Sequence, residues 1–149
     1  MLESWLDFHR ETLLWKCAGL TDEQLKKRAC PPSTLTLLGL VRHMNEVEQG
    51  WFGRFVGDDE RVYSTDEWLD ADFDDLDKAD VAEDFAAFER QCARSRERAA
   101  GRGLDERFVS PRGREISLRW IYVHMIEEYA RHNGHADLIR EAIDGTVGD

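Results

Sequence analysis

The sequence predicts an all-α protein built as a four-helix bundle, and three observations lead to this prediction. Four long segments carry apolar residues at the three- and four-residue spacing of an amphipathic helix. Residues that cap helices precede most of these segments, and glycine follows several of them. The length of 149 residues is enough to bury a core of adequate size. We therefore expect a single four-helix-bundle domain over residues 1–149.

Residues that start and stop helices predict where each element begins and ends. Thr21–Gln24 has the form of a capping box and predicts a short helix after the first long one. Asp80 and Ser117 stand where they would cap two of the long helices, and Gly145 follows the last one. The expected long helices are about Leu2–Ala18, Ser33 or Thr36 to Val56, Asp80 to Gly101 or Gly103, and Ser117–Ile143, and the short helix is about Asp22–Arg28.

Two long connections are expected, between the second and third and between the third and fourth long helices. The first, Gly57–Lys78, is acidic and has no helical period. Its aromatic residues are Tyr63, Trp68 and Phe73. We expect these aromatics to pack on the domain, as a functional wall does, and the aspartates from Asp70 to Asp77 to be solvated. The second connection, Leu104–Ile116, is expected to be an extended segment or a hairpin around Pro111 to Gly113.

Charge and cysteine content exclude several classes of partner. The formal net charge is -11, which disfavours nucleic acid and anionic membrane surfaces as partners. No apolar run approaches the ~20 residues that a membrane-spanning helix needs. The cysteines, Cys17, Cys30 and Cys92, are odd in number and widely spaced. They predict reduced thiols and a cytoplasmic protein.

The last predicted long helix carries the most informative pattern in the sequence. His124, Glu128 and His132 recur every four residues, so they project from one face of the helix. His135 follows His132 by three residues and leans towards the same side. This face continues into Trp120, and we expect it to point into the protein interior.

Buried imidazole and carboxylate groups must be paired, hydrogen-bonded or bound to a metal. A lone buried histidine is more often a satisfied core residue than a ligand, but a row of such groups on one helix favours a divalent metal. A further ligand is expected from His43, on the apolar face of the second long helix, with His9 on the first helix as the competitor. This ligand set suits zinc, nickel, iron(II) or manganese alike, and three protein ligands leave a position open for water or substrate.

The neighbouring residues leave alternatives open. His124 and His135 are expected beside the metal ligands or at the surface, without binding the metal themselves. Arg131 either reaches an anionic substrate or, as we expect, is simply exposed. Trp51 either contacts a substrate or, as we expect, lies in the core.

Two blocks of the sequence resemble the DinB/YfiT-like superfamily, a set of metal-binding four-helix bundles. The first block is Pro32-Ser-Thr-Leu-Thr-Leu-Leu-Gly-Leu-Val-Arg-His43-Met-Asn-Glu-Val-Glu48, followed by Trp51-Phe52. The second block is Glu127-Glu-Tyr-Ala-Arg-His-Asn-Gly-His-Ala-Asp-Leu-Ile-Arg-Glu141. The resemblance covers essentially the whole chain. Within the superfamily it is nearest to the actinobacterial branch proposed as mycothiol S-transferases.

The resemblance implies both a site and a reaction. In the wider superfamily the last helix usually supplies His-x-x-x-His before a glycine, whereas here Glu128 takes the first of those positions. The set then resembles the His-Glu-His zinc site of mycothiol-dependent maleylpyruvate isomerases, which implies His43, Glu128 and His132 as ligands and zinc as the metal. It further implies mycothiol as co-substrate, held as a reactive thiolate and transferred to an electrophile, and a homodimer.

Two other functions are compatible with the same residues. One is a non-catalytic metal-binding module that serves in a stress response or in protein interactions, because a fold alone does not establish a reaction. The other is metal-dependent hydrolysis, in which bound water is the nucleophile. A metal site that is open to solvent would favour a reaction over a purely structural role.

Overall fold

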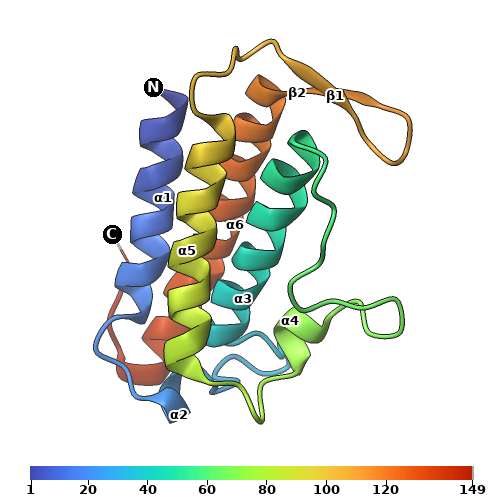
Figure 1. Cartoon of the computed structure of the whole chain (residues 1–149). Helices are drawn as coiled ribbons and strands as arrows, with labels where there is room; N and C mark the ends of the chain where they lie inside the picture. Colours follow the sequence, from blue (N-terminus) through green and yellow to red (C-terminus); the bar gives the residue numbers. More distant parts are fainter. Residues whose placement is uncertain (149) are drawn as a thin grey trace.

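The computed structural model describes residues 1–148 and confirms the all-α prediction. Four long helices, α1, α3, α5 and α6, lie side by side, and a small hairpin projects from one end of the molecule (Figure 1). The elements are α1 (Leu2–Cys17), α2 (Asp22–Leu25), α3 (Leu37–Glu48), the π-helix η1 (Gln49–Gly53), α4 (Ala71–Asp74), α5 (Val81–Ala99), β1 (Arg107–Val109), β2 (Glu115–Ser117) and α6 (Leu118–Asp144). No helix among residues 1–148 is both long and apolar enough to cross a membrane.

The capping residues that the sequence indicates start the helices in the structure. The Thr21 side chain accepts from the Gln24 amide and the Gln24 side chain accepts from the Thr21 amide, which completes the capping box of α2. Of the two candidates for α3, Thr36 is the cap, and its hydroxyl oxygen accepts from the Gly39 amide at 2.9 Å. Asp80 and Ser117 cap α5 and α6 in the same way. Helix starts are therefore set by local sequence, as predicted.

The apolar faces of the long helices meet in one core. α1 packs chiefly against α6, α3 packs against both α5 and α6, and α5 also packs against η1. Leu6, Leu13, Leu40, Met44 and Met125 have no exposed surface. Each fully buried side chain of this kind stabilises the fold by roughly 1.5–3 kcal/mol relative to an exposed one. This packing holds α3 and α6, the two helices that carry the candidate site, in contact.

A polar cluster in this core joins all four long helices. Arg10 on α1 donates two hydrogen bonds of 2.7 Å to the carboxylate of Glu48 on α3. Tyr129 on α6 donates to the same carboxylate at 2.9 Å, and the Sγ of Cys92 on α5 lies 4.0 Å from the tyrosine oxygen. Burial and then the charge of Glu48 raise the pKa of Tyr129, so its hydroxyl stays protonated and donates. The cluster satisfies the buried charges and fixes how the helices align.

One turn of the second long helix departs from the expected α geometry. The helix ends near Val56 as predicted, but Gln49–Gly53 forms a π turn within it. A Cβ atom at Gly53 would lie only 2.5 Å from the carbonyl oxygen of Asp58, so this position requires glycine. Trp51 and Arg54 line a cavity together with residues of the hairpin, and Trp51 also packs against the edge of the core.

The acidic connection packs against α3 instead of forming a free loop. The Glu46 carboxylate accepts from the backbone amides of Val62, Tyr63 and Ser64. Arg42, which is buried, donates to the backbone carbonyls of Ala71 and Asp72 at 3.2 and 3.1 Å. These contacts confirm that the segment packs on the domain, and they hold the short helix α4 against α3. Tyr63 and Phe73 are half-buried as expected, but the expectation is wrong for Trp68, whose exposed fraction is 45%.

The prediction that every aspartate from Asp70 to Asp77 is solvated is wrong for one of them. Asp74, Asp75 and Asp77 are exposed, but Asp72 is buried on the side of α4 that faces α3. Its carboxylate has a histidine partner there, which offsets the cost of burying the charge.

The hairpin resolves the alternative left open for the connection between α5 and α6. β1 and β2 pair antiparallel, with Phe108 opposite Ile116. Gly113 has a φ of +74°, a left-handed conformation that glycine adopts without strain, and its amide donates to the Ser110 carbonyl. The hairpin leads directly into α6, whose cap Ser117 is also the last residue of β2.

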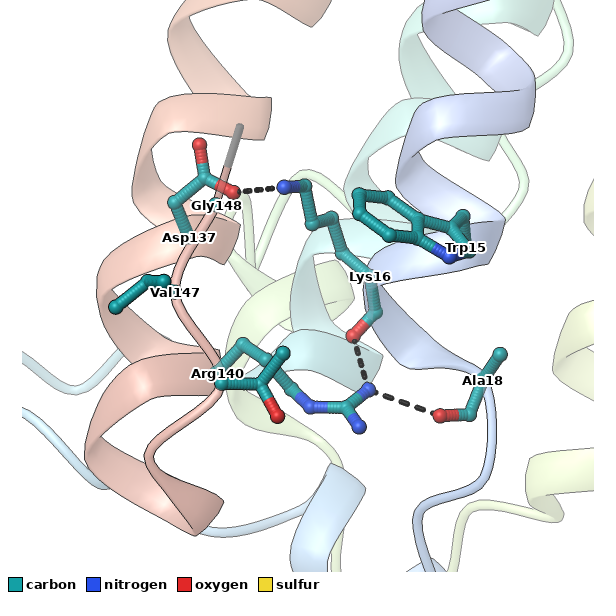
Figure 2. A pocket seen from close by; sticks show the side chains of 8 residues that line it. Trp15, Lys16, Ala18, Asp137, Arg140, Val147 and Gly148 are labelled. Carbon is teal, nitrogen blue, oxygen red and sulfur yellow. Dashed lines mark hydrogen bonds and ion pairs between the residues drawn. The ribbon is translucent and has the colours of Figure 1, made fainter.

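The far end of α6 is fastened to α1. Arg140 donates to the backbone carbonyls of Lys16 and Ala18 at 3.0 and 2.9 Å, and Lys16 pairs with Asp137 (Figure 2). The small cavity between these groups, of about 110 Å³, lies against Val147. Its polar groups bond to one another, which indicates a structural role.

Candidate metal centre

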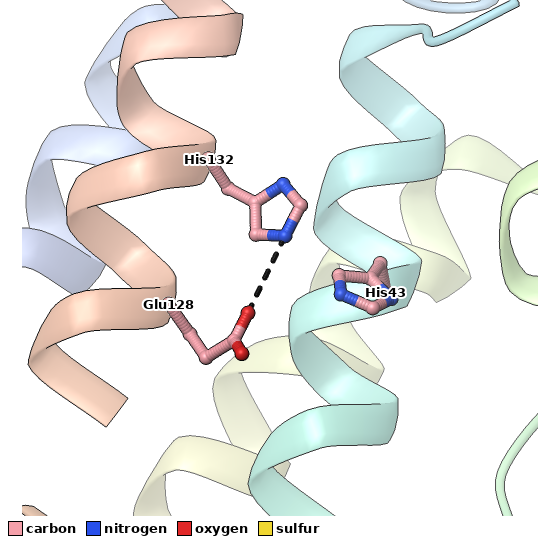
Figure 3. A group of neighbouring side chains, drawn as sticks. All are labelled: His43, Glu128 and His132. Atoms are coloured by element: carbon pink, nitrogen blue, oxygen red, sulfur yellow. Dashed lines mark ion pairs between the residues drawn. The ribbon is translucent and has the colours of Figure 1, made fainter. Parts of the chain in front are cut away.

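Three side chains from two helices come together as the sequence predicts. Glu128 and His132 extend from α6 towards α3, and His43 extends from α3 (Figure 3). One nitrogen or oxygen atom from each of the three lies within 4.8 Å of the other two. Atoms that share an ion at the ~2.0–2.2 Å typical of Zn–N and Zn–O bonds are about 3–4 Å apart, so modest side-chain movements would bring these three to that spacing.

His43 is oriented by two residues of α4. Its Nδ1 atom lies 2.7 Å from the Oδ2 atom of the buried Asp72. At this distance the ring N–H donates to the carboxylate, which leaves Nε2 as the acceptor atom of the imidazole. The ring of Phe73 stacks on His43 with centroids 4.4 Å apart. A carboxylate behind a histidine is the usual support of a metal-binding imidazole, because it fixes the tautomer and the ring orientation.

His132 is held in its neutral form. Burial and then the neighbouring His43 lower the pKa of His132 to about 4. Its Nε2 lies 3.5 Å from the Oε2 of Glu128, and its Nδ1 lies 3.3 Å from the Nδ1 of His135. A neutral imidazole has a free lone pair, which is the form that binds a metal.

The carboxylate of Glu128 lies between two histidines. Its Oε2 faces His132 and its Oε1 lies 3.5 Å from the Nε2 of His124. His124 also approaches Glu127, at 3.6 Å, so that His124, Glu127 and Glu128 form a second group of potential donors. This second group lacks a donor from another helix and includes the exposed Glu127. The group that spans α3 and α6 is the better enclosed of the two.

The donor set fits a divalent metal, and solvent has access to it. Two imidazoles and one carboxylate suit zinc and the later first-row metals, and they leave coordination positions free. The exposed fractions of the side chains are 21% for His43, 17% for Glu128 and 10% for His132. A site with this composition and access can activate a ligand that approaches from outside.

The other candidates from the sequence have varied positions. His124 contacts Glu128 and His135 contacts His132, so both are beside the group, as expected. Arg131 is exposed and pairs with Glu127 on the same helix. His9, the competitor of His43, lies apart, and Asn133 donates to its backbone carbonyl.

Trp51 packs against the core at its edge, whereas Trp120 departs from the predicted inward position. Trp51 is half-buried, and Trp120 has an exposed fraction of 44%, so the prediction that this face points inward as far as Trp120 is wrong. Their ring centroids are 5.0 Å apart, and both rings contact His124, at 4.9 and 4.7 Å. The two indoles therefore lie next to His124, at the edge of the candidate site.

Sequence reasoning missed the contacts that Asp72 and Phe73 make with His43. Both lie in a segment without a helical period, and aspartates are frequent there. One signal in the sequence could have pointed to them. Phe73 directly follows Asp72, and the segment was expected to pack on the domain through its aromatic residues. That signal does not say which aspartate meets His43, since the answer depends on the path of the chain between Gly57 and Asp80.

Comparison with protein families gives a match over nearly the whole chain. The family model described as Mycothiol-S-transferase matches residues 1–145. Comparisons with curated proteins and with solved structures gave no match. The matched region includes α3, α4 and α6, and thus every residue of the candidate site. This chain therefore belongs to the mycothiol-S-transferase family, within the DinB/YfiT-like superfamily.

Proposed function

We propose that this protein is a divalent-metal-dependent S-transferase that uses mycothiol, or a closely similar low-molecular-weight thiol, as co-substrate. The observation that carries the proposal is the convergence of His43, Glu128 and His132 in a member of the mycothiol-S-transferase family. Zinc is the first candidate for the metal, ahead of nickel, iron(II) and manganese. A bound ion of this kind supplies Lewis acidity, which favours the thiolate form of a thiol.

The protein residues have distinct tasks in this proposal. His43, Glu128 and His132 hold the ion, with Asp72 accepting a hydrogen bond from His43 and fixing its tautomer. His132 is neutral at physiological pH because its pKa is low, so it needs no deprotonation before it binds. His124 contacts the Oε1 of Glu128 and restrains the carboxylate. Cys17 and Cys92 have no role in the reaction, since burial raises the pKa of each thiol to about 12.

The access of solvent to the site supports a reaction over a closed structural centre. Structural zinc sites are usually complete with four protein ligands, whereas catalytic sites keep a position free. Here the described residues bring three donors together, and each is partly exposed. The arrangement therefore suits an external thiol as a further ligand.

The proposal includes the architecture and assembly of the molecule. The side-by-side arrangement of α1, α3, α5 and α6 supports a four-helix bundle, and one shared core supports a single domain (Figure 1). A homodimer is supported by an aromatic face on α1, formed by Trp5, Phe8 and Trp15, whose exposed fractions are 54–57%. Exposed aromatic patches of this kind mark interaction surfaces.

Metal analysis combined with a thiol-transfer assay tests the proposal. The purified protein should contain close to one divalent ion per chain, and it should consume mycothiol in the presence of a panel of electrophiles. His43→Ala and His132→Ala should each lose both the ion and the turnover, because two ligands bind far more weakly than three. Melting curves of the variants would separate loss of the site from loss of the fold.

His9→Ala is the matched control, since it removes a half-buried histidine that belongs to neither donor group. It should keep both the ion and the turnover. Full activity after complete removal of metal would contradict the proposal, and so would a metal content that both ligand substitutions leave unchanged.

A further inference from the structure

A large cavity lies at the start of α6, and two of its lining residues contact His124. It has a volume of about 620 Å³ and lies between η1, the β1–β2 hairpin and the first turn of α6. This volume is in the range of pockets that bind small organic molecules, roughly 300–1,000 Å³. It is larger than the cavities lined by Asp137 and Arg140, by Arg10 and Tyr122, by Asn45 and Arg94, and by Leu104 and Val123.

The walls of the cavity are positively charged in a protein that is strongly acidic overall. Four of the lining residues are arginines, Arg54, Arg107, Arg112 and Arg114, and the one acidic residue among them is Glu115. Arg54 is paired with Asp59, and Arg107 with Glu115. Arg112 and Arg114 form no ion pair with any residue in the range 1–148. Two guanidinium groups thus remain free to bind an anion.

Backbone groups of the helix start do not supply this positive charge. The amide of Leu118 donates to the Glu106 carbonyl, and that of Arg119 donates to the Leu104 carbonyl. The Trp120 amide donates to Ser117. These three amides are therefore not available to an anion, whereas the arginine side chains are.

The floor of the cavity connects it to the candidate metal centre. Trp51 and Trp120 line the cavity, with their rings tilted by 59° to one another. Both rings also contact His124, which stacks on Trp120 with the ring planes 21° apart. His124 in turn lies 3.5 Å from Glu128. The two indoles thus contact both the arginine-lined cavity and a histidine that lies beside the proposed metal ligands.

We propose that this cavity is the subsite for the electrophilic substrate, and that this substrate is a small molecule with a flat apolar body and a carboxylate or phosphate group. The guanidinium groups of Arg112 and Arg114 bind the anionic group through paired N–H donors, a geometry that suits both anions. The indole rings of Trp51 and Trp120 contact the apolar body. The proposal rests on the transferase function above, for which it names the substrate class. A long polyanion is excluded because it would meet the acidic remainder of the surface.

Calorimetric titration with simple aromatic probes tests the subsite. The probes are 2-naphthoate, 2-naphthyl phosphate and neutral 2-naphthamide, which have the same ring system. At least one of the two anions should bind, and the amide should bind at least about tenfold more weakly than that anion. The double variant Arg112→Gln/Arg114→Gln should weaken binding of the anion by about tenfold or more and leave the amide unchanged. Preference between carboxylate and phosphate then identifies the anionic group.

The control variant is Lys27→Gln/Arg28→Gln, which removes the same net charge from an exposed site outside the cavity. It should bind the probes as the parent protein does. Equal binding of anion and amide, no binding of either anion, or anion binding that survives the double arginine substitution would overturn the subsite.

The same titration on His43→Ala separates this proposal from the proposed function. Retained, arginine-dependent binding of the anion in a protein without metal or thiol turnover would uphold the subsite and remove the transferase mechanism. Normal metal content and thiol turnover in the parent protein, without arginine-dependent anion binding, would uphold the transferase function and overturn the subsite.

Discussion

At the residue scale, the contact between Asp72 and His43 links the acidic connection to the candidate site. The spacing of Glu128 and His132 could be derived from the sequence, because residues four apart lie on one face of a helix. The place of His43 followed from its apolar helix face and from a family resemblance. Asp72 could not be found in this way, since the chain reaches His43 only after it turns back against α3.

Replacing Asp72 should weaken metal binding without removing a ligand. In Asp72→Asn the side chain keeps its size but loses the charge that holds the Nδ1–H of His43. We expect metal affinity to fall by about 10–100-fold, the usual effect of changing the partner of a metal-binding histidine. Competition with a chelator of known affinity measures this change. The control is Asp74→Asn, on the same short helix but exposed, which should leave the metal affinity unchanged. Equal loss of affinity in both variants would contradict the proposed support of His43 by Asp72.

The low pKa of His132 predicts that acid destabilises the metal-free protein. In the unfolded chain the histidine takes up a proton near its ordinary value of about 6.5, whereas the folded form stays neutral down to about 4. The contribution to stability is therefore complete above about pH 6.5 and is lost as the pH falls towards 4.

Denaturant unfolding of the chelated protein at about pH 7.5 and about pH 5 measures this effect. The contribution of His132 to the loss in free energy of unfolding should be of the order of 1–2 kcal/mol. The difference between the two pH values should shrink by this amount in His132→Asn, which has no titrating ring. An unchanged pH dependence in that variant would show that other groups cause it.

At the scale of elements, apolar periodicity and caps predicted the long helices, because these signals are local. The π turn η1 was not predicted, since the space around Gly53 depends on Asp58 and on the tertiary fold. Trp120 was misplaced for a similar reason. It stands in the first turn of α6, where the other long helices no longer cover that face and the hairpin leaves a cavity.

The buried pair of Arg10 and Glu48 should be strongly coupled across α1 and α3. Glu48→Leu leaves the guanidinium of Arg10 buried without its main partner and should lower the free energy of unfolding by about 3–5 kcal/mol. The double variant Arg10→Met/Glu48→Leu should recover most of this loss, because apolar side chains then fill the space. Chemical denaturation of the single and double variants gives the coupling free energy.

An exposed ion pair serves as the comparison. Arg90 and Glu83 form an ion pair in which both side chains are more than half exposed. Arg90→Gln breaks this pair and should lower the free energy of unfolding by less than about 1 kcal/mol. A similar cost at the two locations would mean that the core pair is less desolvated than its burial indicates.

At the scale of the whole molecule, the aromatic face on α1 should control assembly. Trp5 and Phe8 contact each other edge to face at 5.9 Å, but no other helix covers them among residues 1–148. Sedimentation velocity should report a dimer for the parent protein and a monomer for Trp5→Glu/Phe8→Glu, since a charge on each partner would be buried in the interface. Trp68→Glu, at an exposed tryptophan of the acidic connection, should remain dimeric. A monomeric parent would rule out the homodimer.

The π turn in the second long helix has a consequence for how this chain tolerates changes in length. Such a turn accommodates one residue more than an α turn while the flanking segments keep their facing. Deleting Gly50, whose removal takes away no side chain, should convert η1 to regular α-helix and leave Glu48 and Phe55 where they are. The side chains that must take new directions lie within the turn itself, and among them Trp51 lines the arginine-lined cavity. A one-residue indel could therefore reshape the ligand cavity while the core stays intact.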